Sequence, residues 1–157
     1  MNDRADILAL IPHQGAMCLL DRVLSWDDER IECAAASHRS PDNPLRDGAG
    51  LRALHLCEYG AQAMAVHGGL LARRAGASAA PGLLVSLRAV RLHVARIDAL
   101  DGELRIEALR LLDGGQALQY AFKAWHRDAL LAEGRAAVMQ GVDGIAPAPA
   151  PHLPSNP

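Results

Sequence analysis

Residues 51–74, LRALHLCEYGAQAMAVHGGLLARR, decide the fold. Their apolar side chains recur at helical spacing, which predicts one long helix. At 1.5 Å per residue such a helix is about 30 Å or more in length. The stretch is apolar on nearly every side, so we expect other structure to surround it rather than leave one face in water.

Strand-like segments flank this predicted helix on both sides. The connection Asp113-Gly114-Gly115 is typical of a tight hairpin turn. A short helix begun by Asn2 or Asp3 and ended by Pro12 opens the chain. Strands are predicted at residues 17–25, 30–37, 83–94, 103–112, 116–126 and 130–139. This order predicts an α+β protein in which an antiparallel sheet curls around a single central helix.

The composition narrows the function classes. The chain has 157 residues and a formal net charge of -2, with 50% hydrophobic but only 3% aromatic residues. The core must therefore consist mostly of Leu, Val, Ile and Ala. The near-neutral charge argues against a general nucleic-acid binder or a polybasic membrane protein. Lys123 is the only lysine, against fifteen arginines. This preference for arginine is explained by a compositional bias of the genome as well as by a function.

The cysteines and the two ends of the chain further limit the classes of protein that fit the sequence. Cys18, Cys33 and Cys57 form no C-x-x-C pair, so neither a zinc ribbon nor a disulfide framework is encoded. No apolar stretch is long enough for a signal peptide or a membrane span, so we expect a cytoplasmic protein. Residues 141–157 are rich in Gly, Pro and Ala, which predicts a disordered tail after a folded domain at residues 1–140.

Two motifs occur in order along the chain: IPHQGAMCLLDRVLSWD at residues 11–27 and EYGAQA at residues 58–63. The first is similar to the Pro-His and Leu-x-Asp-Arg-Val that open the hotdog-fold 3-hydroxyacyl-acyl-carrier-protein dehydratases. The second resembles the Glu-Ala-Met-Ala-Gln of their central helix. NPLRDG at residues 43–48 and EYGAQAMAVHGGL at residues 58–70 most resemble the branch found with aryl-polyene pathways. The resemblance covers about residues 8–140 and implies a hotdog fold.

The resemblance also implies a reaction and its requirements. A histidine from one subunit and a helix carboxylate from the other would remove water from a 3-hydroxyacyl group on the phosphopantetheine of acyl carrier protein, with no other cofactor. A neutral histidine suits removal of the C2 proton. A carboxylic acid in apolar surroundings keeps a proton to give to the leaving hydroxyl. Gly48 and Gly50, just before the helix, would let backbone N–H groups approach the thioester carbonyl.

The resemblance transfers to some residues and not to others. Glu58 holds the position of the helix carboxylate, four residues before Gln62. Gln62 either orients Glu58 or satisfies a buried polar contact. The His-Phe-Pro-Gly of the well-known dehydratases is absent. His38, twenty residues before Glu58, is our candidate base. One alternative is His55, on the same helical face as Glu58. The other is that no histidine is catalytic.

The sequence positions of His13 and His67 favour structural roles for these two histidines. We interpret His13, in the Pro-His motif, as a capping or packing residue, and His67 as a buried, hydrogen-bonded one. Since no His, Asp and Glu cluster at ligand spacing, we predict no metal. Arg88 and Arg91 would point to opposite faces of a regular strand. Arginines near the site would suit an acidic carrier protein, and solvated strand edges explain them equally well.

The leading interpretation is a dimeric dehydratase with Glu58 as general acid and His38 as general base. The dimer is either a homodimer or a heterodimer with a second hotdog protein, and neither nucleic acid nor membrane is an expected partner. A hotdog thioesterase is one alternative, because a helix carboxylate alone can activate water or attack a thioester. A non-catalytic subunit that supports an active paralogue is another, which the missing His-Phe-Pro-Gly favours.

Overall fold

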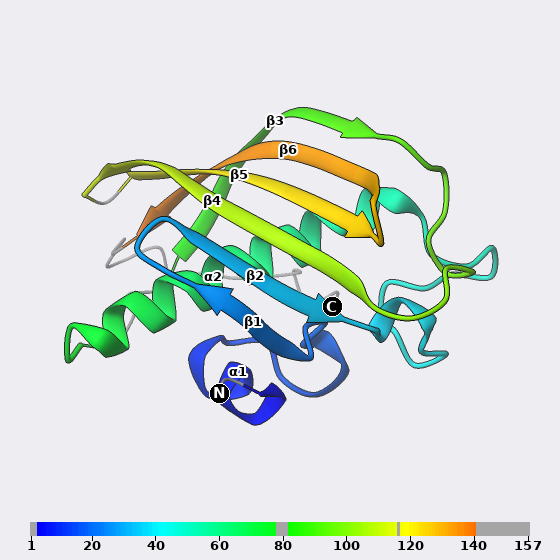
Figure 1. Cartoon of the computed structure of the whole chain (residues 1–157), viewed down its shortest axis with the longest axis horizontal. Helices are drawn as coiled ribbons and strands as arrows, with labels where there is room; N and C mark the ends of the chain where they lie inside the picture. Colours follow the sequence, from blue (N-terminus) through cyan, green and yellow to red (C-terminus); the bar gives the residue numbers. More distant parts are fainter. Residues whose placement is uncertain (1–2, 78–81, 116, 141–157) are drawn as a thin grey trace, which may run out of the picture.

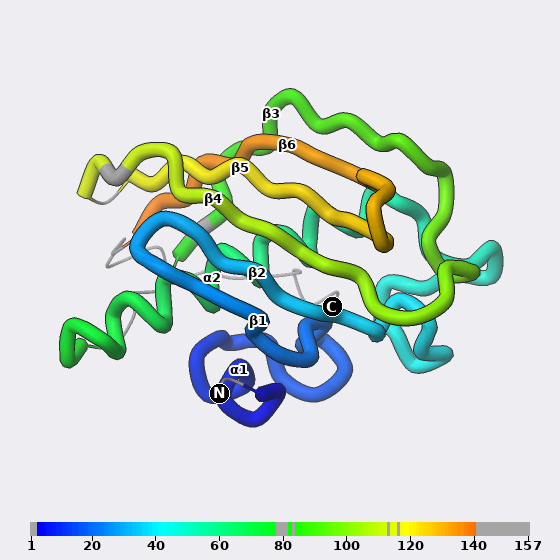
Figure 2. The backbone as a smooth tube through the Cα atoms, in the orientation of Figure 1, coloured from blue at the N-terminus to red at the C-terminus, as the bar shows by residue number. Residues whose placement is uncertain are grey.

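The computed structural model describes residues 3–77, 82–115 and 117–140, so the predicted tail at 141–157 lies outside the described residues. Figures 1 and 2 show a curled sheet with helices on one side. The elements in chain order are α1 (Arg4–Leu10), η1 (Gly15–Met17), β1 (Arg22–Trp26), β2 (Arg30–Ala35), η2 (Ser37–Arg39), η3 (Ala53–His55), α2 (Leu56–Arg74), β3 (Gly82–Leu92), β4 (Leu104–Gly114), β5 (Ala117–His126) and β6 (Ala129–Gln140).

The six strands form one antiparallel sheet in the order β1-β2-β4-β5-β6-β3. Helix α2 crosses behind the sheet, and the sheet curves over it (Figure 1). The connections β4–β5 and β5–β6 are hairpins, whereas β3 joins the far side of β6 as an edge strand. This arrangement confirms the α+β hotdog fold expected from the sequence.

Helix α2 lies unusually close to the middle of the sheet. A Cβ atom at Gly60 would lie 2.7 Å from Cγ of Phe122 on β5. A glycine is therefore required there, because no side chain fits between the helix and the sheet. The largest fully buried side chains are Tyr59, Tyr120 and Phe122, and aliphatic residues supply most of the rest of the interior.

The central helix begins later than its periodicity predicts. The prediction placed its start at residue 51, but α2 begins at Leu56 after one turn of 3-10 helix. The backbone before that turn pairs elsewhere: Ile97 N donates to Leu51 O at 3.0 Å, and Ala53 N donates to Ala95 O at 3.0 Å. A helix that began at residue 51 would have bonded Leu51 O to the N–H four residues later, so the bond from Ile97 N replaces an internal one.

The first predicted strand is also shorter than expected, since β1 begins at Arg22 and not at residue 17. The peptide groups before it bond to the central helix. Leu19 N donates to the side-chain oxygen of Gln62 at 2.9 Å, and Met17 O accepts from its side-chain nitrogen at 2.8 Å. The alternating pattern of apolar residues does not reveal this competing use of the backbone.

The described residues bear on three features: a membrane-spanning helix, a metal-ion site and reactive cysteines. Within them, no helix has the length and apolar character needed to cross a membrane. The same residues contain no group of three or more His, Cys, Asp or Glu side chains that could hold a metal ion. The cysteines are free and buried, and burial raises the pKa of the Cys33 thiol to about 12. A thiol in that state is a packing group rather than a nucleophile.

His67 joins α2 to two parts of the sheet. Its side chain is completely buried, with Nδ1 2.8 Å from the Tyr120 hydroxyl and Nε2 2.8 Å from the carbonyl oxygen of Asp27. A carbonyl only accepts, so we assign the proton to Nε2 and the hydroxyl as donor to Nδ1. Burial lowers the pKa of His67 below its usual 6.5, so the folded protein holds this imidazole neutral.

Protonation of His67 should therefore destabilise the fold. At pH values between the lowered pKa of the folded state and about 6.5, His67 is mostly protonated in the unfolded chain and mostly neutral in the folded one. The free energy of unfolding should fall as the pH is lowered from 7 towards 5.5, in a range above the titration of most carboxylates. Urea denaturation of His67→Gln should show a weaker pH dependence than the wild type. The exposed control His93→Gln should keep the wild-type dependence, and an unchanged slope in His67→Gln would contradict the assignment.

Candidate functional site

Within this chain His13 lies next to Glu58, whereas the predicted pairing of Glu58 with His38 was expected between two subunits. Nε2 of His13 lies 3.3 Å from Oε1 of Glu58, and the two side chains are 29% and 34% exposed. Glu58 stands in the first turn of α2, and His13 lies in the loop between α1 and η1. Both groups are thus partly reachable from solvent, and a proton can pass between them over a short distance.

A buried amide fixes the position of this pair. Gln62, one turn after Glu58, is completely buried. Its Nε2 donates to Oε1 of Glu58 at 3.1 Å and to Met17 O at 2.8 Å, while its Oε1 accepts from Leu19 N at 2.9 Å. Gln62 thus contacts the Glu58 carboxylate and also satisfies buried backbone groups, which are the two interpretations that the sequence left open.

The loop that carries His13 is fixed at its other end by Gln14. Nε2 of Gln14 donates to Leu8 O at 2.9 Å and to Ile11 O at 3.2 Å, so it caps the end of α1. Gly15 then turns the chain with a φ of 57°, a conformation that favours glycine. The imidazole thus projects from a segment that is held on both sides.

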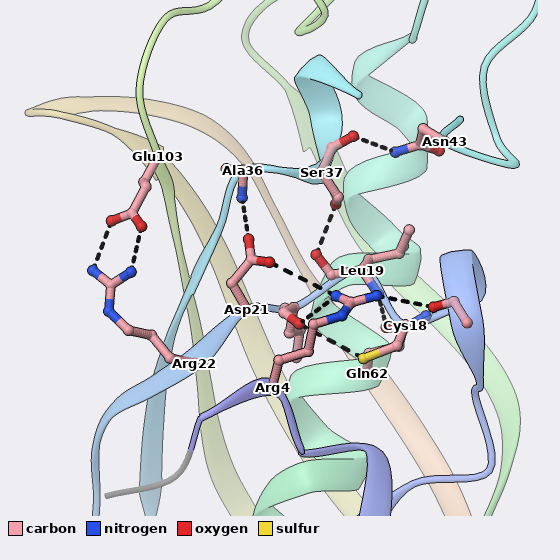
Figure 3. Close-up of polar contacts among 12 residues, drawn as sticks. Arg4, Cys18, Leu19, Asp21, Arg22, Ala36, Ser37, Asn43, Gln62 and Glu103 are labelled. Carbon is pink, nitrogen blue, oxygen red and sulfur yellow. Dashed lines mark hydrogen bonds and ion pairs between the residues drawn. The ribbon is translucent and has the colours of Figure 1, made fainter. Parts of the chain in front are cut away.

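The segment after this loop is held against β2 and η2 (Figure 3). The Ser37 hydroxyl donates to Leu19 O at 2.7 Å, and the Asp21 carboxylate accepts from Ala36 N at 2.6 Å. Ser37 Oγ also lies 2.7 Å from the hydroxyl of the buried Tyr59 on α2. These bonds connect the N-terminal segment to both the sheet and the helix, and they keep the distance between His13 and Glu58 short.

The pair stands at a cavity of about 470 Å3 with mainly apolar walls. Five lining residues of α2, at positions 58, 61, 64, 65 and 68, follow one helix face. Ten residue steps along a helix span about 15 Å. The cavity is lined by Leu10, Pro12, His13, Glu58, Ala61, Met64, Ala65, Gly68, Gly82, Leu84, Leu118, Tyr120, Val138 and Gln140. It can hold an extended apolar chain with a reactive carbon beside Glu58.

His38 has a different environment. Its side chain is completely buried, Nε2 lies 2.9 Å from Leu100 O, and Nδ1 has no partner among the described residues. Burial lowers its pKa. In the described part of the chain no contact joins His38 to Glu58, and His38 is not a lining residue of the cavity.

The remaining predicted site residues also lie apart from the cavity. His55 belongs to η3 and precedes the helix. Gly48 is exposed, with no atom near its missing side chain. Gly50 has a φ of 106°, and a Cβ there would overlap the guanidinium of Arg96 and the carboxylate of Asp98. The requirement for glycine at position 50 is thus explained by this close packing.

Sequence reasoning assigned His13 only a structural role. The Pro-His motif was the only signal in the sequence that could have pointed to His13. In sequence, 45 positions separate residues 13 and 58. Helical spacing favours neighbours three or four residues away, so it offered His55 as an alternative to the candidate base His38.

A family model described as ApeP-like, ApeP dehydratase, matches residues 5–146. No curated protein sequence matches the chain significantly. Among solved structures, the dehydratase heterocomplex ApeI:P from Xenorhabdus doucetiae contains a chain with a TM-score of 0.79 and 25% sequence identity. That match covers 87% of this chain and 91% of the other.

More distant structures show the same fold. An HP0420 homologue from Helicobacter felis has a TM-score of 0.59 at 12% identity, covering 86% of this chain and 88% of that one. A hypothetical thioesterase with coenzyme A from Streptococcus pneumoniae has a TM-score of 0.54 at 9% identity, covering 76% and 84%. At such low identity the likeness concerns the fold alone.

Proposed function

The chain belongs to the ApeP-like dehydratase family, and from this premise we propose that it converts 3-hydroxyacyl thioesters on acyl carrier protein into 2-enoyl thioesters, in aryl-polyene or related biosynthesis. One observation carries the proposal: the His13 imidazole lies 3.3 Å from the Glu58 carboxylate at an apolar cavity. A base and an acid beside a channel for an acyl chain are what elimination of water requires.

Each group has one task in the proposed reaction. Neutral His13 takes the C2 proton, and the electron pair left on C2 forms the C2–C3 double bond as the C3–O bond breaks. Protonated Glu58 gives its proton to the departing oxygen, which leaves as water. The imidazolium then returns a proton to the carboxylate over the 3.3 Å that separates Nε2 from Oε1. Gln62 keeps the carboxylate in position through its 3.1 Å hydrogen bond.

Substitution of either group should stop the reaction. Loss of a general acid or base reduces rates by about 10²- to 10⁴-fold. We expect losses of that order for Glu58→Gln and His13→Ala, measured as formation of the 2-enoyl thioester. His38→Gln should alter kcat by less than about threefold, because general acid–base effects need direct reach of the reacting atoms. If His38→Gln removes activity and His13→Ala does not, the base is His38 instead.

The products distinguish the alternatives. A thioesterase would release free acid and free carrier thiol, whereas the proposed enzyme keeps the thioester intact. A non-catalytic subunit would show no dehydration alone and no loss in a complex when Glu58 is changed to Gln. The assay should therefore be run both with this chain alone and with a co-purified hotdog partner, and mass spectrometry of the carrier should identify the product.

The cavity favours a medium or long apolar acyl chain. Its lining residue Gly68 has no side chain, and a Cβ at this position would meet only Nε2 of Gln140, at 3.4 Å. A larger side chain at residue 68 would extend across the cavity about 15 Å from Glu58, counted along the helix. The acyl chain would then have to stop short of this point.

Gly68→Leu should therefore shorten the accepted substrate. We expect kcat/KM to fall at least about tenfold for a twelve-carbon 3-hydroxyacyl substrate and to change little for a four-carbon one, since a blocked pocket excludes only the longer chain. Ala72→Leu, on the same helix but outside the cavity, is the matched control. Equal effects of Gly68→Leu on both substrates would place the acyl chain elsewhere.

A second hotdog chain is the proposed partner, at the free edge of β3. Among described residues of this strand, Leu84, Val85, Leu87 and Leu92 are 41%, 56%, 40% and 42% exposed. A long apolar strand with an unpaired edge favours pairing with another chain. The similar chain from Xenorhabdus doucetiae belongs to a dehydratase heterocomplex, ApeI:P, which supports a heterodimer with a second hotdog protein.

A charge on this edge should prevent pairing. Leu87→Lys is expected to shift the protein from a complex towards single chains, because a lysine on an edge strand opposes strand addition. Native mass spectrometry or size-exclusion chromatography measures this shift. Leu24→Lys, at a residue 45% exposed on the opposite edge strand β1, should leave the complex intact. Dissociation by Leu24→Lys alone would assign the interface to β1.

A further inference from the structure

The three sequence motifs behind the family resemblance meet in one series of hydrogen bonds. Asn43 belongs to NPLRDG, Tyr59 to EYGAQA, and Leu19 to the Pro-His motif. Nδ2 of Asn43 donates to the Tyr59 hydroxyl at 3.1 Å. That hydroxyl lies 2.7 Å from Oγ of Ser37, which donates to Leu19 O at 2.7 Å. Figure 3 shows Ser37 between Asn43 and Leu19. We name Asn43, Tyr59 and Ser37 the hydroxyl relay.

The donors of the hydroxyl relay all point in one direction. Oδ1 of Asn43 accepts from Leu45 N at 2.9 Å, so Nδ2 is the side of this amide that donates. Leu19 O only accepts, so the Ser37 hydroxyl donates to it and accepts from Tyr59. Burial raises the pKa of Tyr59, so its hydroxyl keeps the proton that it donates. Each proton therefore has one position, and the relay has a single arrangement.

The hydroxyl relay ends at the residue that holds Gln62. Leu19 accepts from Ser37 through its carbonyl oxygen, and its N–H donates to Oε1 of Gln62 at 2.9 Å. Nε2 of Gln62 then donates to Oε1 of Glu58 at 3.1 Å. Leu19 also belongs to the same N-terminal segment as His13. The relay is thus connected to both members of the proposed catalytic pair.

The hydroxyl relay is shielded from bulk water. Tyr59 is 0% exposed, Asn43 is 5% exposed, and Ser37 is half-buried. Water cannot easily replace a missing partner in such surroundings, so the loss of one group displaces its neighbours or leaves a polar atom unpaired. The ring of Tyr59 would fill its place in the core equally well without the hydroxyl. Packing alone therefore does not account for a tyrosine at this position.

We propose that Tyr59, oriented by Asn43, is a positioning residue that holds the proposed catalytic pair at its separation of 3.3 Å. This inference rests on the dehydratase function proposed above, because it takes His13 and Glu58 as the acid–base pair. In the described part of the chain, neither Tyr59 nor Asn43 lines the cavity, so both act along the hydrogen bonds and not on the substrate. A misplacement of reacting groups by about 1 Å can slow a reaction about a hundredfold.

Removal of single hydroxyl groups tests the proposal. The assay uses the full chain with its co-purified partner and a 3-hydroxyacyl group on acyl carrier protein. Tyr59→Phe should lower kcat about tenfold and change KM less than about twofold, since misplaced groups slow the chemistry and not the binding. Ser37→Ala should act in the same way, and Ser37→Thr, which keeps a hydroxyl, should retain more of kcat. Asn43→Asp, which removes the donor to Tyr59, should also lower kcat.

Two controls separate positioning from stability. Ser40→Ala removes a hydroxyl from the same loop, where Oγ accepts from Asp42 N at 3.2 Å, and should keep the wild-type kcat. Ile31→Val removes one methyl group from the buried core and should lower the melting temperature without lowering kcat. A kcat of Tyr59→Phe equal to that of Ile31→Val would overturn the proposal.

A double-mutant cycle identifies the group on which the hydroxyl relay acts. Tyr59→Phe/Glu58→Gln should be less than about threefold slower than Glu58→Gln alone, because the carboxylate to be positioned is already absent. A second, full tenfold loss in the double variant would mean that Tyr59 acts independently of Glu58, and the proposal would then be wrong.

The side-chain amide of Gln62 provides a measurement that does not require activity. Its nuclear magnetic resonance signals, assigned by their loss in Gln62→Glu, should move in Tyr59→Phe and in Ser37→Ala but not in the two controls. Unchanged signals in Tyr59→Phe would contradict the positioning role. If the wild type dehydrates no carrier-bound substrate, the proposed reaction fails, while these signals still decide whether the hydroxyl relay positions Gln62.

Discussion

The buried amide of Gln62 is the interaction on which the site depends. Its three hydrogen bonds join α2 to the N-terminal segment through Met17 and Leu19, and they also hold Glu58. A buried amide left without partners costs stability, so each of these bonds also specifies where the segment lies. The position of His13 beside Glu58 follows from this attachment. The architecture of the sheet and helix alone would not determine it.

Small residues on α2 allow the helix to serve two purposes. At Gly60 the absence of a side chain lets Phe122 of the sheet approach closely. At Ala61, Ala65 and Gly68 small residues leave open the cavity beside the helix. A chain with only 3% aromatic residues thus gains a tight core on one side of the helix and free space on the other.

Local patterns predicted the elements well because their causes are local. Asp3 begins α1 with a reciprocal capping box, as its position before an apolar run suggests. His67 is a buried, hydrogen-bonded histidine, as expected for a polar residue on an apolar helix. Errors arose where distant groups compete for the backbone. Met17 and Leu19 bond to the side chain of Gln62, and Leu51 bonds to Ile97, so neither segment follows its own periodicity.

The sequence by itself determined the hotdog fold, the position of its central helix and the carboxylate at Glu58. Hydrophobic period, turn residues and ordered motifs contain that information. Only the tertiary structure decided which histidine meets Glu58 and which arginines share a face. His13 reaches Glu58 through a loop attached by Gln62, and Arg88 joins Arg91 through a bulge at Ala89. Both depend on contacts between residues far apart in the chain or on one extra residue in a strand, and no periodic pattern records either.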